Sequence, residues 1–395
     1  INCMNKKVLL YIGSRANYSS AKSLLKAFKN HEKLDPIVIL GAAALVDKYG
    51  NLEELIKSDG FNIDHKISFL VEGGKLENMA QSCGIAMNNF PSIIEKYNPD
   101  YIFVIGDRFD VLPIASTAML MNIPLAHSMG GERSGTVDES IRHAISKMAN
   151  LHFVANQDAM DRLIKMGELP ETIFNVGCPR IDYISETVNE FKKGNMLPSK
   201  TIFERYQGVG NEFDVLKEDF LLVSFHPVTT EYKDLRELTR NLLHALSLLK
   251  MKVIMLWPNA DAGNEFISKE IRVFREKHTP NWLYLFKNLP VEVYLQLLYL
   301  CKCLVGNSSS AVREGEFIGV KAVNIGSRQN ARLRGKNLID CGYSEESIKQ
   351  AISLQVSSKG DLKSEYLYGS GNSANEVADI LANTNIENTQ KLNSY

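Results

Sequence analysis

Residues 104–152 read VIGDRFDVLPIASTAMLMNIPLAHSMGGERSGTVDESIRHAISKMANLH and indicate the fold of this 395-residue chain. One apolar run ends in Gly106-Asp107-Arg108, and a second, IPLAH, ends shortly before Gly130-Gly131-Glu132. Each run is typical of a buried strand, and the segment between them is typical of a helix. A further helix is expected to open near Asp138 and to carry Arg142 and His143. This alternation predicts a parallel sheet.

Charged side chains follow the ends of both expected strands. In an open parallel sheet, the carboxyl ends of the strands and the loops beyond them form the ligand crevice. Six titratable residues should therefore meet at one edge, namely Asp107, Arg108, Glu132, Asp138, Arg142 and His143. The alternative is a solvated, charged helix start that Thr136 or Asp138 caps. The gathering of acids, bases and cations favours chemistry over that alternative.

The rest of the chain repeats the same alternation. Short apolar runs alternate with amphipathic segments up to Gly177, and the pattern restarts at Phe220 after a weakly periodic stretch. We predict an α/β fold of two Rossmann-like, doubly wound domains with a cleft between them. The expected parts are an N-terminal domain (1–185), a connection (186–219), a C-terminal domain (220–375), and a helix end with a loose tail (376–395).

The composition excludes several classes of protein. Apolar residues make up 45% of the chain, charged residues 23%, and the formal net charge is −1, which argues against a nucleic-acid partner. No apolar run is long enough to span a bilayer, so no membrane association is expected. The six cysteines are sparse, and Cys301-Lys302-Cys303 has the wrong spacing for a zinc pair. We expect reduced thiols in a cytoplasmic protein without a metal site.

Three short motifs could hold an anion. Gly13-Ser14-Arg15 lies between a strand and a helix, so loop amides and Arg15 could bind a phosphate, or could form an ordinary turn. Gly306-Asn307-Ser308-Ser309-Ser310 could do the same or could simply cap a helix, with Glu314 on that helix as a ribose acceptor. His226 ends a strand before a proline, where it could donate to a phosphate. The chain has no G-x-G-x-x-G dinucleotide fingerprint and no P-loop lysine, so we expect no cofactor.

These residues belong to a longer pattern that resembles the hydrolysing UDP-N-acetylglucosamine 2-epimerases, which make N-acetylmannosamine (ManNAc) for sialic acid synthesis. The resemblance covers nearly the whole chain in order. It comprises GSRANYS, GDRFD, H-x-x-GGE-x-SGT-x-DESIRHAI-x-K, GCPRID, HPVTT, PNADAG, GNSSSAVRE, NIGSRQ-x-x-R and YGSGN. It implies the GT-B fold, which agrees with the two predicted domains. It also implies UDP-GlcNAc and UDP as ligands and a homodimer or homotetramer as the assembly.

The resemblance implies a reaction and residue roles. UDP leaves the anomeric carbon as a proton leaves C2, and the resulting 2-acetamidoglucal is hydrated to ManNAc. Asp107 and Asp138 match the carboxylates at the sugar, and Arg108, Arg142 and His143 would orient them or bind sugar and phosphate. The matching ligand contacts are Arg15, His226, Ser308, Ser309 and Arg328 around the diphosphate, Glu314 at the ribose, and Asn259 and the Leu289 region near the uridine.

One position departs from the family pattern. In the animal enzyme and the non-hydrolysing relatives, a catalytic glutamate lies two residues after the histidine that matches His127, and some bacterial members have histidine there. Here the position is Met129, which can do neither acid nor base work. The role then falls to Glu132, or to Asp107 and Asp138 alone.

Other functions compete with the UDP-GlcNAc enzyme. One is a hydrolysing 2-epimerase of a UDP- or GDP-linked 2,4-diacetamido-6-deoxy sugar, as in legionaminic acid synthesis, and apolar Met129 is compatible with such a sugar. The spellings GTVDESIRH and HPVTT favour the sialic-acid type, and H-V-E-A-G-L-R, typical of the non-hydrolysing enzymes, is absent. A GT-B glycosyltransferase would need an acceptor, and the sugar-side carboxylates argue against it. A catalytically dead nucleotide-sugar binding module is the last alternative.

Overall fold

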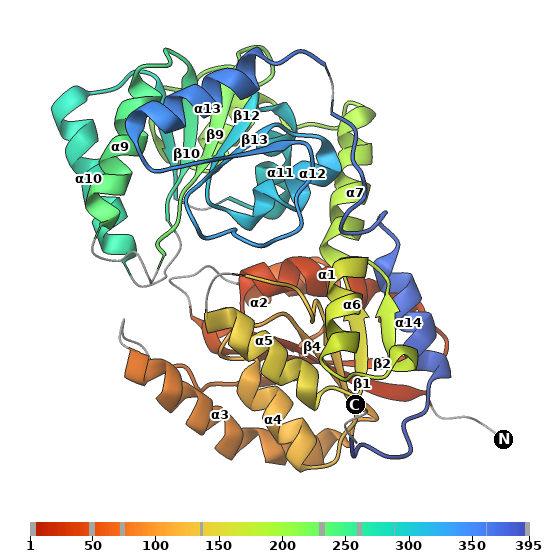
Figure 1. Cartoon of the computed structure of the whole chain (residues 1–395). Helices are drawn as coiled ribbons and strands as arrows, with labels where there is room; N and C mark the ends of the chain where they lie inside the picture. The colour runs from red at the N-terminus through yellow and green to blue at the C-terminus, as the bar shows by residue number, and fades with distance from the viewer. Residues whose placement is uncertain are drawn as a thin grey trace. The chain divides into compact units, whose positions relative to one another are not determined.

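We describe the protein from a computed structural model, which covers residues 5–46, 52–71, 76–134, 137–228, 234–258, 263–287, 289–360 and 362–391. These ranges form two compact units, each built around one sheet (Figure 1). Unit 1 comprises residues 1–133, 137–183 and 368–395, and unit 2 is built from residues 184–367. No helix in the described ranges is long and apolar enough to cross a membrane.

The sheet of unit 1 is parallel throughout, in the order β3-β2-β1-β4-β5-β6-β7. Val8–Ile12 and Tyr101–Ile105 are entirely buried, as expected for strands covered on both faces. The strands are β1 (Lys6–Ile12), β2 (Leu34–Gly41), β3 (His65–Ile67), β4 (Tyr101–Ile105), β5 (Leu125–Ser128), β6 (Leu151–Val154) and β7 (Ile173–Asn175).

The helices of unit 1 begin and end where local signals place them. Ser14 caps the first of them by accepting a hydrogen bond from the amide of Asn17 at 3.2 Å. Its inner face buries Leu24, Leu25 and Phe28 against the sheet. The helices are α1 (Arg15–Asn30), α2 (Leu52–Ser58), α3 (Leu76–Tyr97), α4 (Leu112–Leu120), α5 (Val137–Met148), α6 (Gln157–Lys165) and α14 (Ser373–Asn383), with 3₁₀ turns η1 (Ala42–Leu45) and η3 (Pro170–Thr172).

The sheet of unit 2 has the order β14-β13-β12-β9-β10-β11-β8, with only β8 antiparallel to its neighbour among the described pairs. Its strands are β8 (Gly208–Gly210), β9 (Phe220–Ser224), β10 (Lys252–Leu256), β11 (Leu283–Phe286), β12 (Cys303–Gly306), β13 (Ala322–Ile325) and β14 (Leu338–Cys341). Its helices are α8 (Ser199–Arg205), α9 (Leu235–Ser247), α10 (Asn264–His278), α11 (Val291–Leu300), α12 (Glu314–Ile318) and α13 (Glu345–Ser357), with the 3₁₀ turn η5 (Ser309–Ala311). Helix α7 (Pro179–Lys192) leads from one unit to the other.

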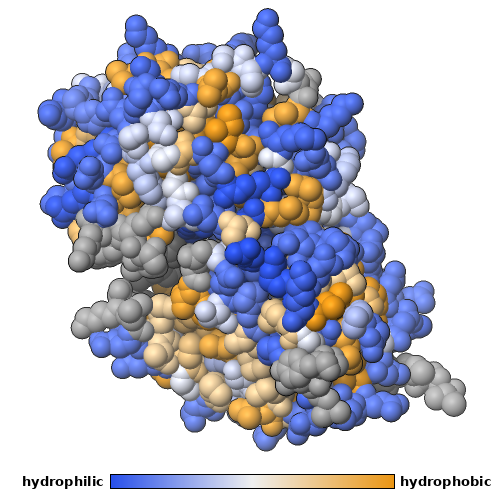
Figure 2. Space-filling model, in the orientation of Figure 1, coloured by the Kyte–Doolittle hydropathy of each residue, from blue (hydrophilic) through white to orange (hydrophobic). Residues whose placement is uncertain are grey.

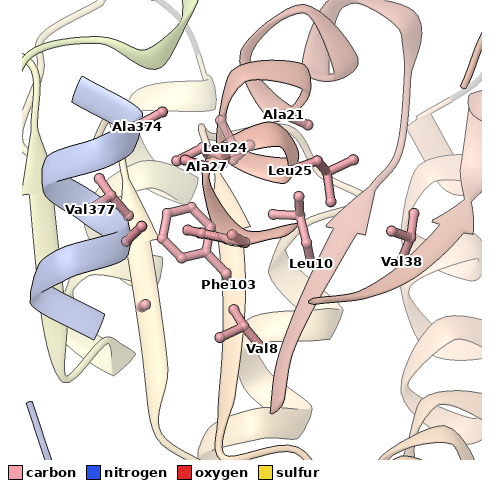
Figure 3. Close-up of a cluster of buried hydrophobic side chains, with 14 of the residues drawn as sticks. Val8, Leu10, Ala21, Leu24, Leu25, Ala27, Val38, Phe103, Ala374 and Val377 are labelled. Atoms are coloured by element: carbon pink, nitrogen blue, oxygen red, sulfur yellow. The ribbon is translucent and has the colours of Figure 1, made fainter. Parts of the chain in front are cut away.

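The C-terminal segment returns to unit 1. Figure 3 shows Ala374 and Val377 of α14 beside Leu24, Ala27 and Phe103 in one cluster of buried side chains. Burying a side chain of this size stabilises a fold by about 2 kcal/mol. The structure therefore places the boundary near Leu367, where the chain leaves unit 2, and not at the predicted residue 375. Local periodicity shows that a helix has an apolar face, but not which core that face joins.

The stretch 186–219 also differs from the expected connection. It contains α8, whose Phe203 stacks on Phe286 of β11 with ring centroids 5.7 Å apart. It also contains β8, which pairs with β11. The stretch belongs to unit 2 because Phe203 packs on β11 and the backbone of β8 pairs with the same strand.

Candidate functional site

The site in unit 1 begins where β4 and β5 end. The two strands are parallel neighbours, so Gly106-Asp107-Arg108 and Gly130-Gly131-Glu132 emerge at the same edge of the sheet. Gly106 and Gly131 have φ values of +81° and +74°, which are open to glycine and costly for other residues. The tight turns that these glycines allow bring both loops towards α5.

Arg142 contacts two of the other predicted residues directly, Asp107 and Glu132. Its guanidinium is 2% exposed, donates from Nη1 to the carbonyl of Glu132 at 2.7 Å, and forms an ion pair from Nη2 to the carboxylate of Asp107. The Glu132 side chain is also buried, whereas that of Asp107 is 24% exposed. A buried cation is costly without a partner, so Asp107 and Arg142 hold each other at this edge.

His127 on β5 organises the same loops. Its Nε2 lies 2.8 Å from the carbonyl oxygen of Gly106, and its Nδ1 lies 3.2 Å from the hydroxyl of Ser146 on α5. A carbonyl can only accept, so Nε2 carries the proton and Nδ1 accepts from Ser146. Burial lowers the pKa of His127 to about 3, so the ring is neutral at ordinary pH. The motif contained this residue, but no local signal in the sequence shows that it ties β4 to α5.

Arg108 is held by a carboxylate that sequence reasoning did not select. Its Nε donates to Asp110 at 3.2 Å, and Asp110 is 1% exposed. The other Asp110 oxygen accepts from the hydroxyl of Tyr11 at 3.1 Å, and burial, followed by the charge of Asp110, raises the pKa of that hydroxyl well above its usual value. A Cβ on Gly13 would lie 1.8 Å from Asp110 Oδ2, so only glycine fits there.

The other predicted residues of unit 1 lie on helices α5 and α1. Asp138 is in the first turn of α5, and His143 Nε2 lies 3.5 Å from Glu139 one turn earlier. Burial lowers the pKa of His143. Arg15 is the first residue of α1, and its buried Nε makes no hydrogen bond within the described ranges. Asn17, half a turn later, donates to the carbonyl of Ile105 at 3.1 Å and so ties α1 to the end of β4.

Met129 has a packing role. Its backbone adopts φ +66°, and its side chain is half-buried against the core cluster that contains Phe153 and Val176. Its Sδ lies 3.9 Å from Sγ of Cys178. Methionine offers no exchangeable proton, so acid–base work at this edge has to come from the neighbouring carboxylates.

In unit 2, Asn307 connects the ends of two neighbouring strands. It is fully buried, accepts from the backbone amide of His226 and donates to the carbonyl of His226, both at 2.8 Å. Its own carbonyl accepts from Arg328 at 3.2 Å and from Gln329 at 2.9 Å. Three loops are thus fixed by one amide residue. The sequence motif included Asn307, but its pattern gave no reason to prefer it over the serines.

His226 is a neutral donor or acceptor in this arrangement. It is 7% exposed, and its Nε2 lies 3.0 Å from the hydroxyl of Ser224. Burial lowers its pKa to about 3, and the positive charge of Arg328 acts in the same direction. The imidazole therefore offers directional hydrogen bonds, and Arg328 provides the charge.

The remaining predicted residues of unit 2 follow β11 and β12, except for Asn259, which lies outside the described residues. Ser308 accepts from the amide of Ser310 at 3.3 Å and so caps the 3₁₀ turn that begins at Ser309. The helix expected after these serines is the five-residue α12, and buried Glu314 is its first residue. Leu289 precedes α11 and is half-buried. Gly306 has no room for a Cβ, which would lie 2.0 Å from the carbonyl of Ser224.

The arrangement can support proton transfer and anion binding. Unit 1 offers carboxylates beside a buried guanidinium, and unit 2 offers a neutral imidazole, a guanidinium and hydroxyls at strand ends. No three His, Cys, Asp or Glu side chains in the described ranges are grouped in a way that could hold a metal ion.

Comparison with known proteins gives the family. Residues 26–382 match the family model described as UDP-N-acetylglucosamine 2-epimerase. A UDP-N,N'-diacetylbacillosamine 2-epimerase (hydrolyzing) of Legionella pneumophila is 32% identical over 387 residues, covering 96% of each chain. A UDP-N-acetylglucosamine 2-epimerase of Neisseria meningitidis is 30% identical, covering 96% of this chain and 95% of that one.

Solved structures agree on the fold. The Neisseria meningitidis UDP-GlcNAc 2-epimerase bound to UDP-GlcNAc superposes with a TM-score of 0.79 at 14% identity, covering 96% of this chain and 100% of that one. The Methanocaldococcus jannaschii UDP-GlcNAc 2-epimerase in complex with UDP-GlcNAc and UDP gives 0.75 at 16% identity, covering 95% and 99%. The predicted GT-B fold of two Rossmann-like domains is confirmed. The chain belongs to the UDP-N-acetylglucosamine 2-epimerase family.

Proposed function

We propose that this protein is a hydrolysing 2-epimerase that converts UDP-GlcNAc and water into ManNAc and UDP. The observation that carries the proposal is the buried Arg142, which joins the Asp107 carboxylate to the Glu132 loop at the carboxyl edge of the sheet in unit 1. A weakly acidic C2–H needs a carboxylate close by, and a departing diphosphate needs fixed cations and donors.

The proposed reaction has two balanced steps. In the first, the bond between C1 and the diphosphate oxygen breaks, the C2 proton passes to a carboxylate, and a C1–C2 double bond forms. In the second, water gives one proton to a carboxylate and adds its oxygen to C1, and a protonated carboxylate returns a proton to C2 on the opposite face. Asp107, Glu132 and Asp138 form the acid–base set, and Arg142 and His143 orient it. Arg108, fixed by Asp110, supplies positive charge.

The nucleotide is proposed to bind mainly to unit 2. His226, Arg328, Ser308 and Ser309 would contact the diphosphate. Glu314 would accept from the ribose hydroxyls, and Asn259 and the Leu289 region would lie near the uridine. The bonds from Asn307 to the His226 backbone and from Arg328 to Asn307 support this assignment, because they fix both groups before a ligand arrives.

A UDP-linked 2,4-diacetamido-6-deoxy sugar is the second candidate substrate. The Legionella pneumophila relative carries that activity in its name, and so does a Campylobacter jejuni relative that is 32% identical over 85% of this chain. The apolar side chain of Met129 is compatible with a sugar that carries a methyl group in place of a hydroxymethyl. The spellings GTVDESIRH and HPVTT support the first candidate instead.

A direct comparison of substrates tests both candidates. The protein is incubated with UDP-GlcNAc, with UDP- and GDP-linked N,N'-diacetylbacillosamine, and with UDP-GalNAc as a control sugar. UDP or GDP release and the free sugar are followed by proton NMR. Free ManNAc from UDP-GlcNAc at the highest kcat/KM supports the first proposal. A higher kcat/KM for a bacillosamine derivative establishes the second, and turnover of neither contradicts both.

We further propose that the protein is a cytoplasmic homodimer or homotetramer. Large apolar side chains are exposed on α3 and α4, among them Ile85, Met87, Met119 and Leu120. Figure 2 shows hydrophobic surface over this part of unit 1. The described cysteines carry free thiols, which suits a reducing compartment. Light scattering coupled to gel filtration tests the assembly, and a single species with the mass of one chain would contradict it.

A further inference from the structure

Residues 384–391 lie along unit 1. Lys6 Nζ donates to the carbonyl of Thr384 at 2.6 Å, and the hydroxyl of Tyr101 donates to the same oxygen at 2.6 Å. Further along, Asn150 Nδ2 donates to the carbonyl of Thr389 at 3.0 Å. The segment expected to end in a loose tail (376–395) therefore follows unit 1 up to Lys391.

Lys391 contacts the C-terminal end of α5. Its ammonium group donates to the carbonyls of Ala149 at 2.7 Å and Ser146 at 3.3 Å, and it forms an ion pair with Glu168. The last carbonyls of a helix have no partner within the helix, and a cation there also interacts favourably with the helix dipole. Lys391 supplies both a hydrogen-bond donor and a positive charge. It lies more than 220 residues after Glu168 along the chain.

Glu168 anchors this contact. It is 2% exposed, accepts from Lys391 and from His152 of β6, the latter at 3.1 Å, and forms an ion pair with Lys147 of α5 at 2.7 Å. Burial alone would raise the pKa of Glu168, but the interactions with these three partners outweigh it and lower the pKa to about 2. The Glu168 side chain is therefore ionised at ordinary pH.

Helix α5 is fixed at two points. Near its middle, Arg142 is bound to Asp107 and to the Glu132 carbonyl. One turn later, Ser146 bonds His127 through its side chain and Lys391 through its carbonyl. The helix has 12 residues, and helices of this length are marginal unless tertiary contacts hold them. The contact at Lys391 therefore limits how far α5 can slide or fray.

We propose that Lys391 is a positioning residue: it fixes the last turn of α5 and so sets the placement of Arg142 and Asp138 for the reaction. The proposal rests on the proposed function of those two residues. It also means that the C-terminal segment is part of the working enzyme. Small displacements of reacting groups carry large rate penalties, so a shift of α5 should lower kcat without removing the binding residues of unit 2.

Matched variants of the full chain test the proposal. Lys391→Met keeps the stem and removes the charge, Lys391→Arg keeps the charge, and Lys57→Met removes an exposed lysine of an i,i+4 pair on α2 as a control. A chain that stops after Gln390 is compared with one that stops after Lys391. Each variant is measured by hydrogen–deuterium exchange of residues 137–148, by kcat and KM for the active UDP-sugar, and by the melting temperature.

The expected pattern separates positioning from stability. In Lys391→Met and in the chain ending at Gln390, amide exchange in the last turn of α5 should rise about tenfold and kcat should fall about tenfold, with KM within about twofold. Lys391→Arg should restore most of kcat, whereas Lys57→Met and the chain ending at Lys391 should match the wild type. Unchanged exchange in α5, or increased exchange with unchanged kcat, overturns the proposal. If the wild type turns over neither sugar, the proposed function fails, and the exchange measurement alone decides whether Lys391 holds α5.

Discussion

Replacing Asp107 by asparagine removes one negative charge beside Arg142 and leaves the size of the side chain unchanged. A well-placed acid or base contributes about 10²- to 10⁴-fold to a rate. We therefore expect kcat for UDP-GlcNAc to fall by that factor, which corresponds to about 3 to 5 kcal/mol of barrier. The proposed diphosphate contacts of His226 and Arg328 do not involve Asp107, so the Kd for UDP should stay within about threefold of the wild type.

The structure also sets the stability cost of this change. Arg142 is buried, and a hydrogen bond to a charged group contributes about 1.5–3 kcal/mol. Because the Asp107 side chain is 24% exposed, water can partly replace the lost charge, and we expect the lower end, about 1.5 kcal/mol. Asp158→Asn is the matched control, since that carboxylate is 49% exposed and pairs with Arg162 on the surface of α6. It should cost about 0.5 kcal/mol or less and leave kcat unchanged.

The assay combines continuous detection of released UDP with calorimetric titration of UDP into the same preparations. Circular dichroism confirms that each variant is folded at the assay temperature. A kcat for Asp107→Asn within threefold of the wild type, with folded protein, would refute the assignment of Asp107 to the acid–base set. A parallel loss of UDP affinity would show that the carboxylate acts through binding instead.

Four further predictions follow from individual contacts. Burial lowers the pKa of His127 from 6.5 to about 3, so the unfolded chain binds more protons, and the melting temperature should fall as pH drops from 6.5 towards 3; a flat profile from pH 7 to 4.5 would contradict this. Leu381→Ala, at a fully buried position on α14, should lower the free energy of unfolding by about 3 kcal/mol in urea titrations, whereas exposed Leu354→Ala should have little effect. Asn307→Ala should weaken UDP binding about tenfold in calorimetry, because it releases the His226 backbone and the Arg328 side chain; unchanged Kd would exclude that role. Gly13→Ala should lower the melting temperature because its Cβ would lie 1.8 Å from Asp110 Oδ2, whereas Gly84→Ala in α3, where a Cβ meets nothing within 4 Å, should raise it.

Local pattern was enough to predict most strands of both sheets and the edge at which Asp107 and Glu132 emerge. Continuous apolar runs bounded by glycine, such as Tyr101–Ile105 before Gly106, can only be satisfied as buried strands. Once the strands are parallel, the residues after them share an edge, which is why Asp107 and Glu132 could be paired in advance. Arg142 could be predicted to lie near them because the helix that carries it comes directly after the Glu132 loop.

Contacts between distant segments could not be predicted in the same way. Nothing around Lys391 or Leu381 distinguishes a loose tail from a segment bound to unit 1, because their partners Glu168 and Phe103 lie hundreds of residues earlier. The hydrogen bond from His127 to the Gly106 carbonyl could not be predicted either, because an isolated histidine in a strand has no preferred partner. Local sequence therefore predicts which elements form, while the partners of buried polar groups depend on the assembled fold.

In the proposed reaction, the carboxyl edge of unit 1 exchanges the C2 proton of a nucleotide-linked N-acetylhexosamine. The most direct test is to incubate the protein with UDP-GlcNAc in deuterated water and to record proton NMR spectra from the first turnover. We expect UDP and free ManNAc with deuterium at C2, and neither product with Asp107→Asn on the same timescale. ManNAc that retains the original C2 proton, or UDP-ManNAc as the released product, would contradict it.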